Sequence, residues 1–249
     1  MDIIGIRTPL FEAGDDLIKF ITHHVPVLWE GDIVAITSKI VALSQGRIAP
    51  LSARTTLIYR DSLKVIETPW AFLTLTHDGW CINAGADESN ANGGIILLPK
   101  NAQKTAEAIR KKFVRHFSHK HLGVLITDTK SVPLRVGTIG RAIGYAGFEP
   151  LKSYIGEKDL FGRKGRFTQS NVADALAASA VFIMGEGDEQ TPIAIIRDAP
   201  VHFINIKQKS ARPAHANLVI SPGADIYAGA FRDAARGSHK PSKKIRRVR

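Results

Sequence analysis

Carboxylate and small polar side chains gather in three turns of the sequence, and these residue types suit metal and phosphate chemistry. The first turn is the stretch AGADESNANGG around Asp87, the second is the Asp128-Thr129 pair, and the third is the stretch MGEGDEQTP around Glu186. Mg²⁺ and Mn²⁺ bind a few carboxylates and keep other positions for phosphate oxygens and water. Three such turns would form a metal–nucleotide site if the fold brought them together, whereas separate acidic turns are ordinary solvated surface.

The common local signatures of nucleotide binding and hydrolysis are absent from the sequence. It contains no GxxxxGK[ST] P-loop, no GxGxxG after a predicted strand, no GxSxG elbow and no HExxH pair. The single cysteine, Cys81, can form neither an intramolecular disulfide nor a thiolate cluster for zinc. Oxygen and nitrogen ligands in loops therefore remain as the candidate chemistry.

Composition indicates a globular chain of one or two domains. The 249 residues are 44% hydrophobic and 23% charged, which is typical of a protein with a buried core. The longest apolar runs are far shorter than the roughly 20 residues of a membrane span, so we expect no membrane partner. The first residues lack the basic and apolar pattern of a signal peptide, and this predicts a cytoplasmic location.

The net charge of +11 is concentrated near the C-terminus. Residues 1–200 carry 23 basic and 21 acidic side chains, whereas residues 201–249 carry 11 and 2. The last ten residues, Lys240 to Arg249, hold six cations and no acid, which predicts a solvated, disordered tail. Such a tail could contact polyanions without reading their sequence, so a non-catalytic nucleic-acid-binding protein is the alternative function, although we do not expect nucleic acid as a partner.

Apolar periodicity predicts the elements that must position the three turns. Predicted strands and helices alternate along the first 200 residues: strands at 3–6, 33–36, 40–43, 122–127 and 193–196, a hairpin over 70–83, and helices from Asp16, over 104–117 and over 171–183. In the basic helix at 104–117 the pattern places Arg110 outward. Asp128 follows the end of the predicted strand 122–127, where a polar side chain can meet a ligand.

A series of short motifs runs along the chain in a fixed order: Gly31-Asp32, Thr37-Ser38-Lys39-Ile40, Asn83 to Asn90, Leu97-Leu98-Pro99, Ile126 to Thr129, Arg135, Ala142-Ile143-Gly144, Gly156, Asp159, Gly162-Arg163, Ala173-Asp174 and Met184 to Pro192. Their order and spacing, over about residues 3 to 198, resemble those of the coenzyme F-420:L-glutamate ligase family.

This resemblance implies an α+β fold of mixed sheets with flanking helices, assembled as an intertwined homodimer. It implies a catalytic domain over residues 1–200, followed by a C-terminal extension over 201–239 and the basic tail over 240–249. The implied activity joins L-glutamate through a γ-glutamyl amide bond to a pterin- or deazaflavin-like acceptor, by way of an acyl phosphate. The implied cofactors are Mg²⁺ or Mn²⁺, with GTP or ATP as co-substrate and K⁺ as a further candidate ion.

The resemblance also assigns roles to individual residues. Its metal ligands correspond to Asp87, Asp128, Thr129 and Glu186. Its nucleotide contacts correspond to Thr8, Pro9, Leu10, Phe11, Ser38, Lys39, Asn90, Gly185, Gly187 and Glu189. Lys39 and Arg135 are the candidate catalytic cations that would neutralise charge on the phosphoryl oxygens.

Two departures from the family pattern concern the acceptor. The stretch Lys130 to Leu134 replaces the Gly-Arg-Pro and aromatic residue that usually follow the Thr-Asp-Thr turn, and Leu43 stands where a lysine is common. Asp87-Glu88-Ser89-Asn90 and Tyr145-Ala146-Gly147-Phe148 are typical of a bacterial branch proposed to glutamylate folates. The acceptor therefore stays open between a folate-like and a deazaflavin-like molecule.

Overall fold

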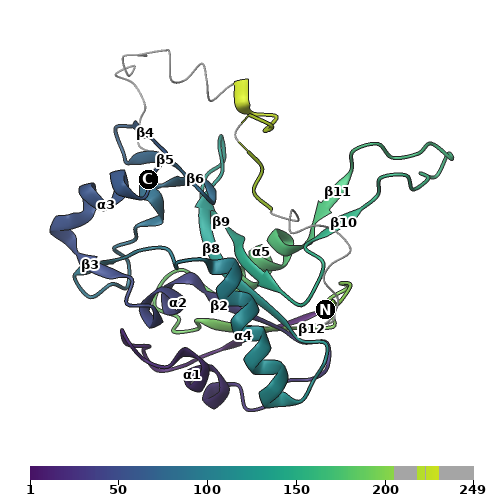
Figure 1. The fold of residues 1–249 in the computed structure, drawn as a ribbon, viewed down its shortest axis with the longest axis horizontal. Coiled ribbons are helices and arrows are strands. Elements are labelled where there is room, and N and C mark those ends of the chain that lie inside the picture. The colour runs from purple at the N-terminus through teal and green to yellow at the C-terminus, as the bar shows by residue number, and fades with distance from the viewer. Residues whose placement is uncertain (205–217, 222, 230–249) are drawn as a thin grey trace. The chain divides into compact units, whose positions relative to one another are not determined.

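Strands in the described part of the chain form four sheets, the largest of which has five strands (Figure 1). The computed structural model describes residues 1–204, 218–221 and 223–229. The chain divides into two units, residues 1–218 and residues 219–249, and all elements named below belong to the first. The predicted boundaries at residues 200 and 239 stay predictions, and the predicted basic tail lies outside the described residues.

The five-stranded sheet has the order β1-β12-β2-β8-β9. Its strands are β1 (Asp2–Ile6), β2 (Ile33–Thr37), β8 (Gly123–Ser131), β9 (Thr138–Ala146) and β12 (Ile193–Arg197). β2 and β8 are parallel, and the other neighbouring pairs are antiparallel. β2 and the first half of β8 are nearly continuous apolar runs, because helices cover both faces of the sheet there and both sides of each strand are buried. The second half of β8, from Asp128 onward, is polar and partly exposed.

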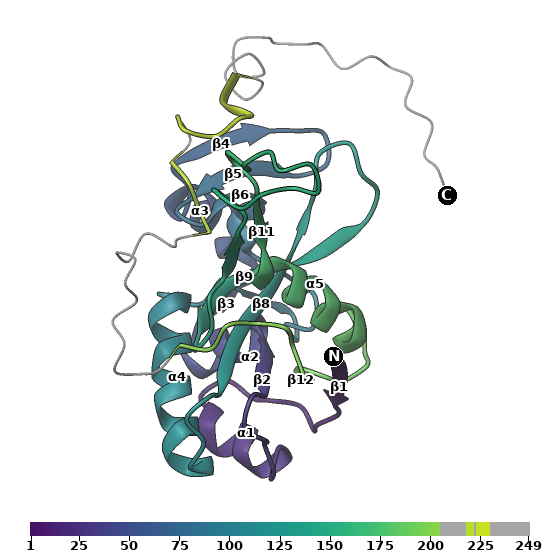
Figure 2. The ribbon, with the colours of Figure 1, turned by 90° about the vertical axis from the view of Figure 1, so that its right-hand side faces the viewer.

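Helices pack on both faces of this sheet. They are α1 (Leu17–His24) and α4 (Ala102–Phe117) on one face, and α5 (Val172–Met184) on the other. Val34 and Ile36 of β2 contribute to the core under α1 and α4, whereas Ile33 and Ala35 contribute to the core under α5. This division follows from the alternation of side chains along a strand, and Figure 2 shows α4 and α5 on opposite sides.

Three smaller sheets and several short helices complete the first unit. The strands are β4 (Lys64–Glu67), β5 (Phe72–Thr76) and β6 (Gly79–Ile82) in one sheet, β3 (Ile48–Pro50) with β7 (Gly94–Ile96), and β10 (Leu151–Ser153) with β11 (Gln169–Asn171). The short helices are α2 (Ser38–Ser44), α3 (Arg54–Arg60) and two single 3₁₀ turns, η1 (Leu51–Ala53) and η2 (Asn83–Gly85). β5 and β6 form the hairpin that the sequence predicts over 70–83.

Two arms, defined as residues 132–137 between β8 and β9 and residues 154–168 between β10 and β11, carry apolar side chains in solvent. Figure 1 shows the longer arm extending beyond β10 and β11. Leu134 and Val136 on the first arm are fully exposed. Leu160, Phe161 and Phe167 on the second arm are almost fully exposed.

Two local predictions are wrong. The predicted strand at 40–43 is helix α2, whose Ile40, Val41 and Ala42 are all buried. A short apolar run buried on every side has the same pattern in a strand and in a helix. Arg110 of α4 is buried rather than outward, because its guanidinium donates hydrogen bonds to the carbonyl oxygens of Leu122, Lys120 and Ile204.

The architecture is a mixed α+β fold with several sheets and flanking helices, as the sequence predicts. Within the described ranges, no helix combines the length and the apolar character that crossing a membrane requires. The homodimer stays a prediction.

Candidate active site

The parallel pairing of β2 with β8 brings Ser38 next to Asp128. The register pairs Thr37 with Thr127, so the residues that follow them, Ser38 and Asp128, lie side by side. Ser38 Oγ donates a hydrogen bond of 3.1 Å to Asp128 Oδ1. Asp128 lies within β8 rather than after its end, because the strand continues into the hairpin with β9.

Burial and one cation determine the ionisation of Asp128. Burial raises the pKa of its carboxyl group, while Arg141 and the hydrogen bond from Ser38 oppose that rise. Arg141 lies directly opposite on β9, with its Nη2 atom 3.5 Å from Asp128 Oδ2, and its side chain is 6% exposed. Its Nη1 donates to the carbonyl oxygen of Asp78, and its buried Nε–H has no acceptor among the described residues. The sequence reasoning missed Arg141.

The first acidic turn is held against β7 and presents Asp87. The backbone of Asp87 exchanges two hydrogen bonds with Ile96, of 2.9 and 2.8 Å. Its Oδ1 accepts the backbone N–H of Ser89 at 2.8 Å, and its Oδ2 accepts Ser89 Oγ at 3.0 Å. Lys39 Nζ lies 2.9 Å from the same Oδ2. Partial burial works to raise the pKa of Asp87, but the bonds from Lys39 and Ser89 outweigh it and hold that pKa below its usual value.

The third turn follows α5 and brings Glu186 to the same place. Thr129 Oγ1 donates to Glu186 Oε2 at 3.3 Å. Partial burial and the negative charges of Asp128 and Asp87 raise the pKa of Glu186, against the bond from Thr129 and the charge of Lys39. Contacts of sequence neighbours place the three carboxylates near one another, because Thr129, next to Asp128, bonds to Glu186, and Lys39, next to the Asp128 partner Ser38, pairs with Asp87. Asp87, Asp128 and Glu186 are called the acidic cluster below.

Hydrogen bonds between loops connect the third turn to two other segments. Asn90 Nδ2 donates to the carbonyl oxygen of Gly187 at 2.9 Å, and the Glu189 carboxylate accepts the N–H of Gly187 at 2.8 Å. The N–H of Thr8 donates to the carbonyl oxygen of Gln190 at 2.9 Å.

Gly185 lets the chain turn sharply at the end of α5. Its φ of +80° is unfavourable for other residues, and a Cβ there would overlap the Glu189 carboxylate. Gly185 therefore allows the close approach of Glu189 to the turn.

The structure brings together many of the residues that the sequence singles out, but not all. The predicted metal ligands, with Ser38, Lys39, Asn90, Gly185, Gly187 and Glu189, lie in or beside the acidic cluster, in β8, at the start of α2 and in the first and third turns. Thr8 is buried, with its hydroxyl bonded to the carbonyl of Pro9, while Pro9 and Leu10 are exposed. Phe11 is a core residue whose ring packs edge-on against Phe20 at 4.9 Å.

Arg135 lies in the first arm, away from the bonds of the acidic cluster. Its backbone N–H donates to the carbonyl oxygen of Val132, and its side chain is exposed. No hydrogen bond or ion pair within the described ranges joins it to the acidic cluster. Its predicted catalytic role stays a prediction.

The donor set of the acidic cluster suits a hard cation. Carboxylate and hydroxyl oxygens are the ligands that Mg²⁺ and Mn²⁺ prefer, and each member of the cluster brings one carboxylate. In the part of the chain that the structure describes, no three Asp, Glu, His or Cys side chains are gathered closely enough to hold an ion as they stand. Chelation would therefore require side-chain rotation around Asp87 and Glu186, which are partly exposed.

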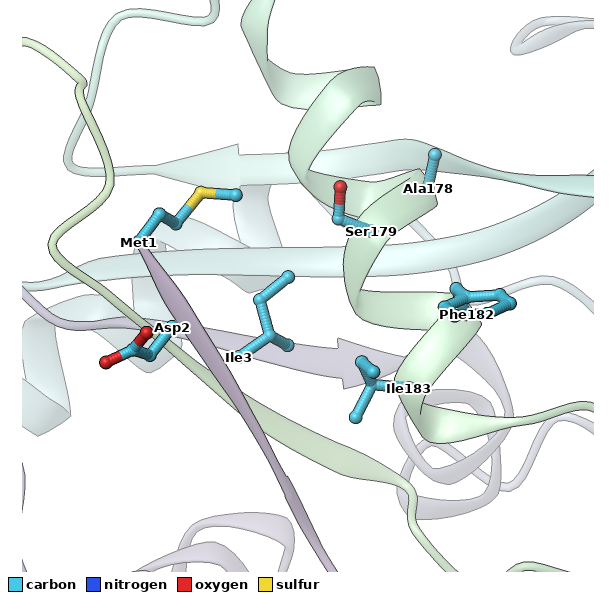
Figure 3. A pocket seen from close by; sticks show the side chains of 7 residues that line it. All are labelled: Met1, Asp2, Ile3, Ala178, Ser179, Phe182 and Ile183. Carbon is cyan, nitrogen blue, oxygen red and sulfur yellow. The ribbon is translucent and has the colours of Figure 1, made fainter.

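A separate, open groove of about 630 Å³ with a mixed polar and apolar lining lies between β1 and α5 (Figure 3). Its walls include Met1, Ile3, Ser179, Phe182 and Ile183. None of the predicted site residues lines it, so it is distinct from the acidic cluster.

Comparison with known proteins gives one family over most of the chain. The family model described as F420-0:Gamma-glutamyl ligase matches residues 5–198. Relatives named coenzyme F420:L-glutamate ligase include that of Methanocaldococcus jannaschii, which is 35% identical with coverage of 83% of this chain and 91% of the relative. That of Methanococcus maripaludis strain C6 is 36% identical, covering 82% and 90%. That of Methanosarcina mazei is 35% identical, covering 86% and 92%.

Proposed function

The chain belongs to the F420-0:gamma-glutamyl ligase family and is an amide-forming γ-glutamyl ligase, and from this premise we propose its substrates and its mechanism. The proposed acceptor is a deazaflavin of the coenzyme F420-0 type, because relatives at 35–36% identity are named for coenzyme F420. The proposed co-substrate is GTP or ATP. The observation that carries the proposal is the acidic cluster beside Ser38 and Lys39, where the parallel pairing of β2 with β8 ends.

Asp87, Asp128 and Glu186, with the hydroxyl of Thr129, would hold Mg²⁺ or Mn²⁺. When bound, such an ion neutralises charge on the phosphoryl oxygens. Ser38 supports this arrangement by orienting the Asp128 carboxylate through its hydrogen bond. Arg141 supports it from the buried side, because it pairs with the other carboxylate oxygen.

The first and third turns and the start of α2 would bind the triphosphate. Lys39 presents a partly exposed ammonium group beside the cluster, and phosphate oxygens are suitable acceptors for it. The bonds of Asn90 to Gly187 and of Thr8 to Gln190 hold the loops in contact, which favours one shared nucleotide site.

The proposed reaction has two steps. The acceptor carboxylate attacks the γ-phosphorus of the triphosphate, which forms an acyl phosphate and releases the nucleoside diphosphate. The amine of L-glutamate then attacks the acyl carbon, so that the amide bond forms, inorganic phosphate leaves and the amine proton passes to solvent. In-line phosphoryl transfer depends mainly on positioning and charge neutralisation, and these are what the acidic cluster and Lys39 would supply.

A homodimer is the proposed assembly. The apolar side chains at the ends of the two arms are unusual for a monomer surface, and a second copy of the chain would bury them. Arg135 lies on the first arm, so the proposed dimer would also determine which site it serves. Light scattering coupled to size-exclusion chromatography tests the assembly.

The decisive experiment is a coupled assay of triphosphate cleavage that requires L-glutamate. Coenzyme F420-0 and tetrahydrofolate are compared as acceptors, with GTP or ATP, in Mn²⁺ and in EDTA. We expect turnover with F420-0 in Mn²⁺ only, and a loss of about 100-fold or more in Asp128→Asn. Asp198→Asn, at the exposed end of β12, is the matched control and should keep full activity.

Turnover with tetrahydrofolate instead would assign the chain to the folate-type branch. Folded, dimeric protein that shows no glutamate-dependent turnover with either acceptor would contradict the proposal.

A further inference from the structure

Lys39 is a partly exposed cation that reaches the acidic cluster from α2. Its Nζ lies 2.9 Å from Asp87 Oδ2 and donates a hydrogen bond of 2.7 Å to Ser89 Oγ. The charge of Lys39 also acts on Glu186. Arg141, by contrast, is buried and donates to the carbonyl oxygen of Asp78, so its guanidinium has less room to move.

At Oδ2 of Asp87, Lys39 occupies a position that a divalent ion bound to this oxygen would need. A carboxylate oxygen has two lone pairs, and Oδ2 of Asp87 already accepts Lys39 and Ser89. The two bonds from Ser89 belong to the same turn as Asp87 and hold it in shape. The bond from Lys39 comes from α2 and is the one that can leave without disturbing the turn.

The backbone next to Lys39 is fixed by the buried Ser38, whereas the side chain of Lys39 is partly exposed to solvent. The preceding residue, Ser38, is buried and bonded to Asp128. The side chain of Lys39 is 25% exposed, and its four-carbon stem can swing from one acceptor to another. A small rotation would therefore transfer the ammonium group without moving α2.

Resting on the function proposed above, we propose that Lys39 is an exchangeable counter-ion of Asp87. A divalent cation displaces its ammonium group from Asp87 Oδ2, and the released ammonium group binds phosphate oxygens of the triphosphate. Metal binding and nucleotide binding are thereby coupled through one side chain.

The exchange predicts effects of opposite sign for the two ligands. Without the ammonium group, a divalent ion meets no competitor at Asp87, so its affinity rises. The triphosphate loses a cation, so its affinity falls. A lysine that only supported the local structure would weaken the binding of both ligands when it is replaced.

The test uses the full chain free of nucleotide. Binding of Mn²⁺ is measured from the electron paramagnetic resonance of the free ion, for the wild type, Lys39→Met and Lys39→Arg. Lys111→Met, an exposed lysine of α4, is the control for the loss of one surface charge. Binding of a non-hydrolysable GTP analogue is then measured at saturating Mn²⁺, and circular dichroism checks that each variant is folded.

We expect Lys39→Met to bind Mn²⁺ about tenfold more tightly and the GTP analogue about tenfold more weakly, each change corresponding to one decade in Kd. Lys39→Arg and Lys111→Met should stay near the wild type for Mn²⁺. Equal or weaker Mn²⁺ binding by folded Lys39→Met would overturn the exchange and leave the metal-dependent ligase standing. Absence of Mn²⁺ binding in every variant would overturn both the exchange and the proposed metal dependence.

Discussion

The ion pair between Arg141 and Asp128 allows a quantitative test of how the acidic cluster is supported. Arg141→Met keeps the length of the side chain and removes its charge and its donors. Asp128 then remains largely buried without its cation. We expect the protein to lose about 3 kcal/mol of unfolding free energy at neutral pH, in the range for removing one partner of a buried pair.

The magnitude follows from the contacts of both residues. Breaking a buried pair from one side costs about 3–5 kcal/mol, and the lower end applies because the pair distance is 3.5 Å and Asp128 keeps its bond from Ser38. Losing the hydrogen bond to the carbonyl oxygen of Asp78 lowers the free energy of unfolding by about 1 kcal/mol. Removing the buried Nε–H, which has no acceptor among the described residues, raises it by about the same amount, so the two effects cancel. At roughly 2–4 °C per kcal/mol for a chain of this size, the expected fall in Tm is roughly 6–12 °C.

The assay is urea unfolding in EDTA of the wild type, both single variants and the double variant with Asp128→Asn. In the Arg141→Met background, Asp128→Asn should be stabilising, because it removes a buried charge that has lost its partner. The expected coupling energy is about 1–3 kcal/mol.

The effect of pH has a definite sign. Burial already raises the pKa of Asp128, and loss of the opposing Arg141 charge raises it further. An acid whose pKa is higher in the folded state favours folding at low pH, and that contribution is lost as pH rises through the raised pKa. The defect of Arg141→Met should therefore be largest at neutral pH and shrink as the pH falls. Additive single variants, or a defect under about 0.5 kcal/mol with no pH dependence, would refute this account.

Three further predictions concern other parts of the first unit. Asp32→Asn should cost about 3 kcal/mol in urea unfolding, because buried Asp32 accepts two bonds, of 2.9 and 2.8 Å, from Arg197. Gly185→Ala should cost about 1–2 kcal/mol and weaken nucleotide binding by calorimetry, because its φ is positive and its Cβ would displace Glu189. Glu186→Gln should raise the stability of the metal-free protein at pH 7 by less than about 1 kcal/mol, and the gain should vanish near pH 4, because the pKa of Glu186 is raised and its charge is unfavourable only when ionised.

Matched variants separate these effects from general damage. Asp198→Asn removes an exposed carboxylate next to Arg197 and should change stability by under about 0.5 kcal/mol. Gly14→Ala places a Cβ at a positive φ with no atom within 4 Å, so it measures the backbone cost without the collision. A Gly185→Ala variant no worse than Gly14→Ala in stability and in nucleotide binding would contradict the role assigned to Glu189.

Local patterns predicted the long elements well and the short ones poorly. The helical spacing of α4 and the alanine-rich face of α5 are visible in sequence because each repeats over several turns. Helix α2 has only seven residues and no exposed polar face of its own, so it was indistinguishable from a buried strand. The burial of Arg110 was likewise not predictable from the local pattern, because the carbonyl oxygens that accept its hydrogen bonds belong to Leu122, after α4, and to Ile204.

Arg141 could have been found from the sequence by one additional step. Positions 128 and 141 are equally distant from the middle of the segment VPLRVG, so a hairpin centred there pairs them. That step requires the hairpin to be predicted first, and the apolar residues of its arm give no turn signature as strong as Asn-Gly or Asp-Gly. The preference of the buried Asp128 for a cation then points to the arginine opposite.

The sequence by itself determined the chemistry of the candidate site: the carboxylates, the glycine turns that carry them and the family to which the chain belongs. Only the tertiary structure decided which of these groups meet. Ser38 and Asp128 are 90 residues apart, and they are neighbours because β2 and β8 pair in parallel within a sheet buried on both faces. The structure likewise left Arg135 on an exposed arm and placed Arg141 beside Asp128. Such pairings depend on the packing of the whole core, which no local pattern of residues encodes.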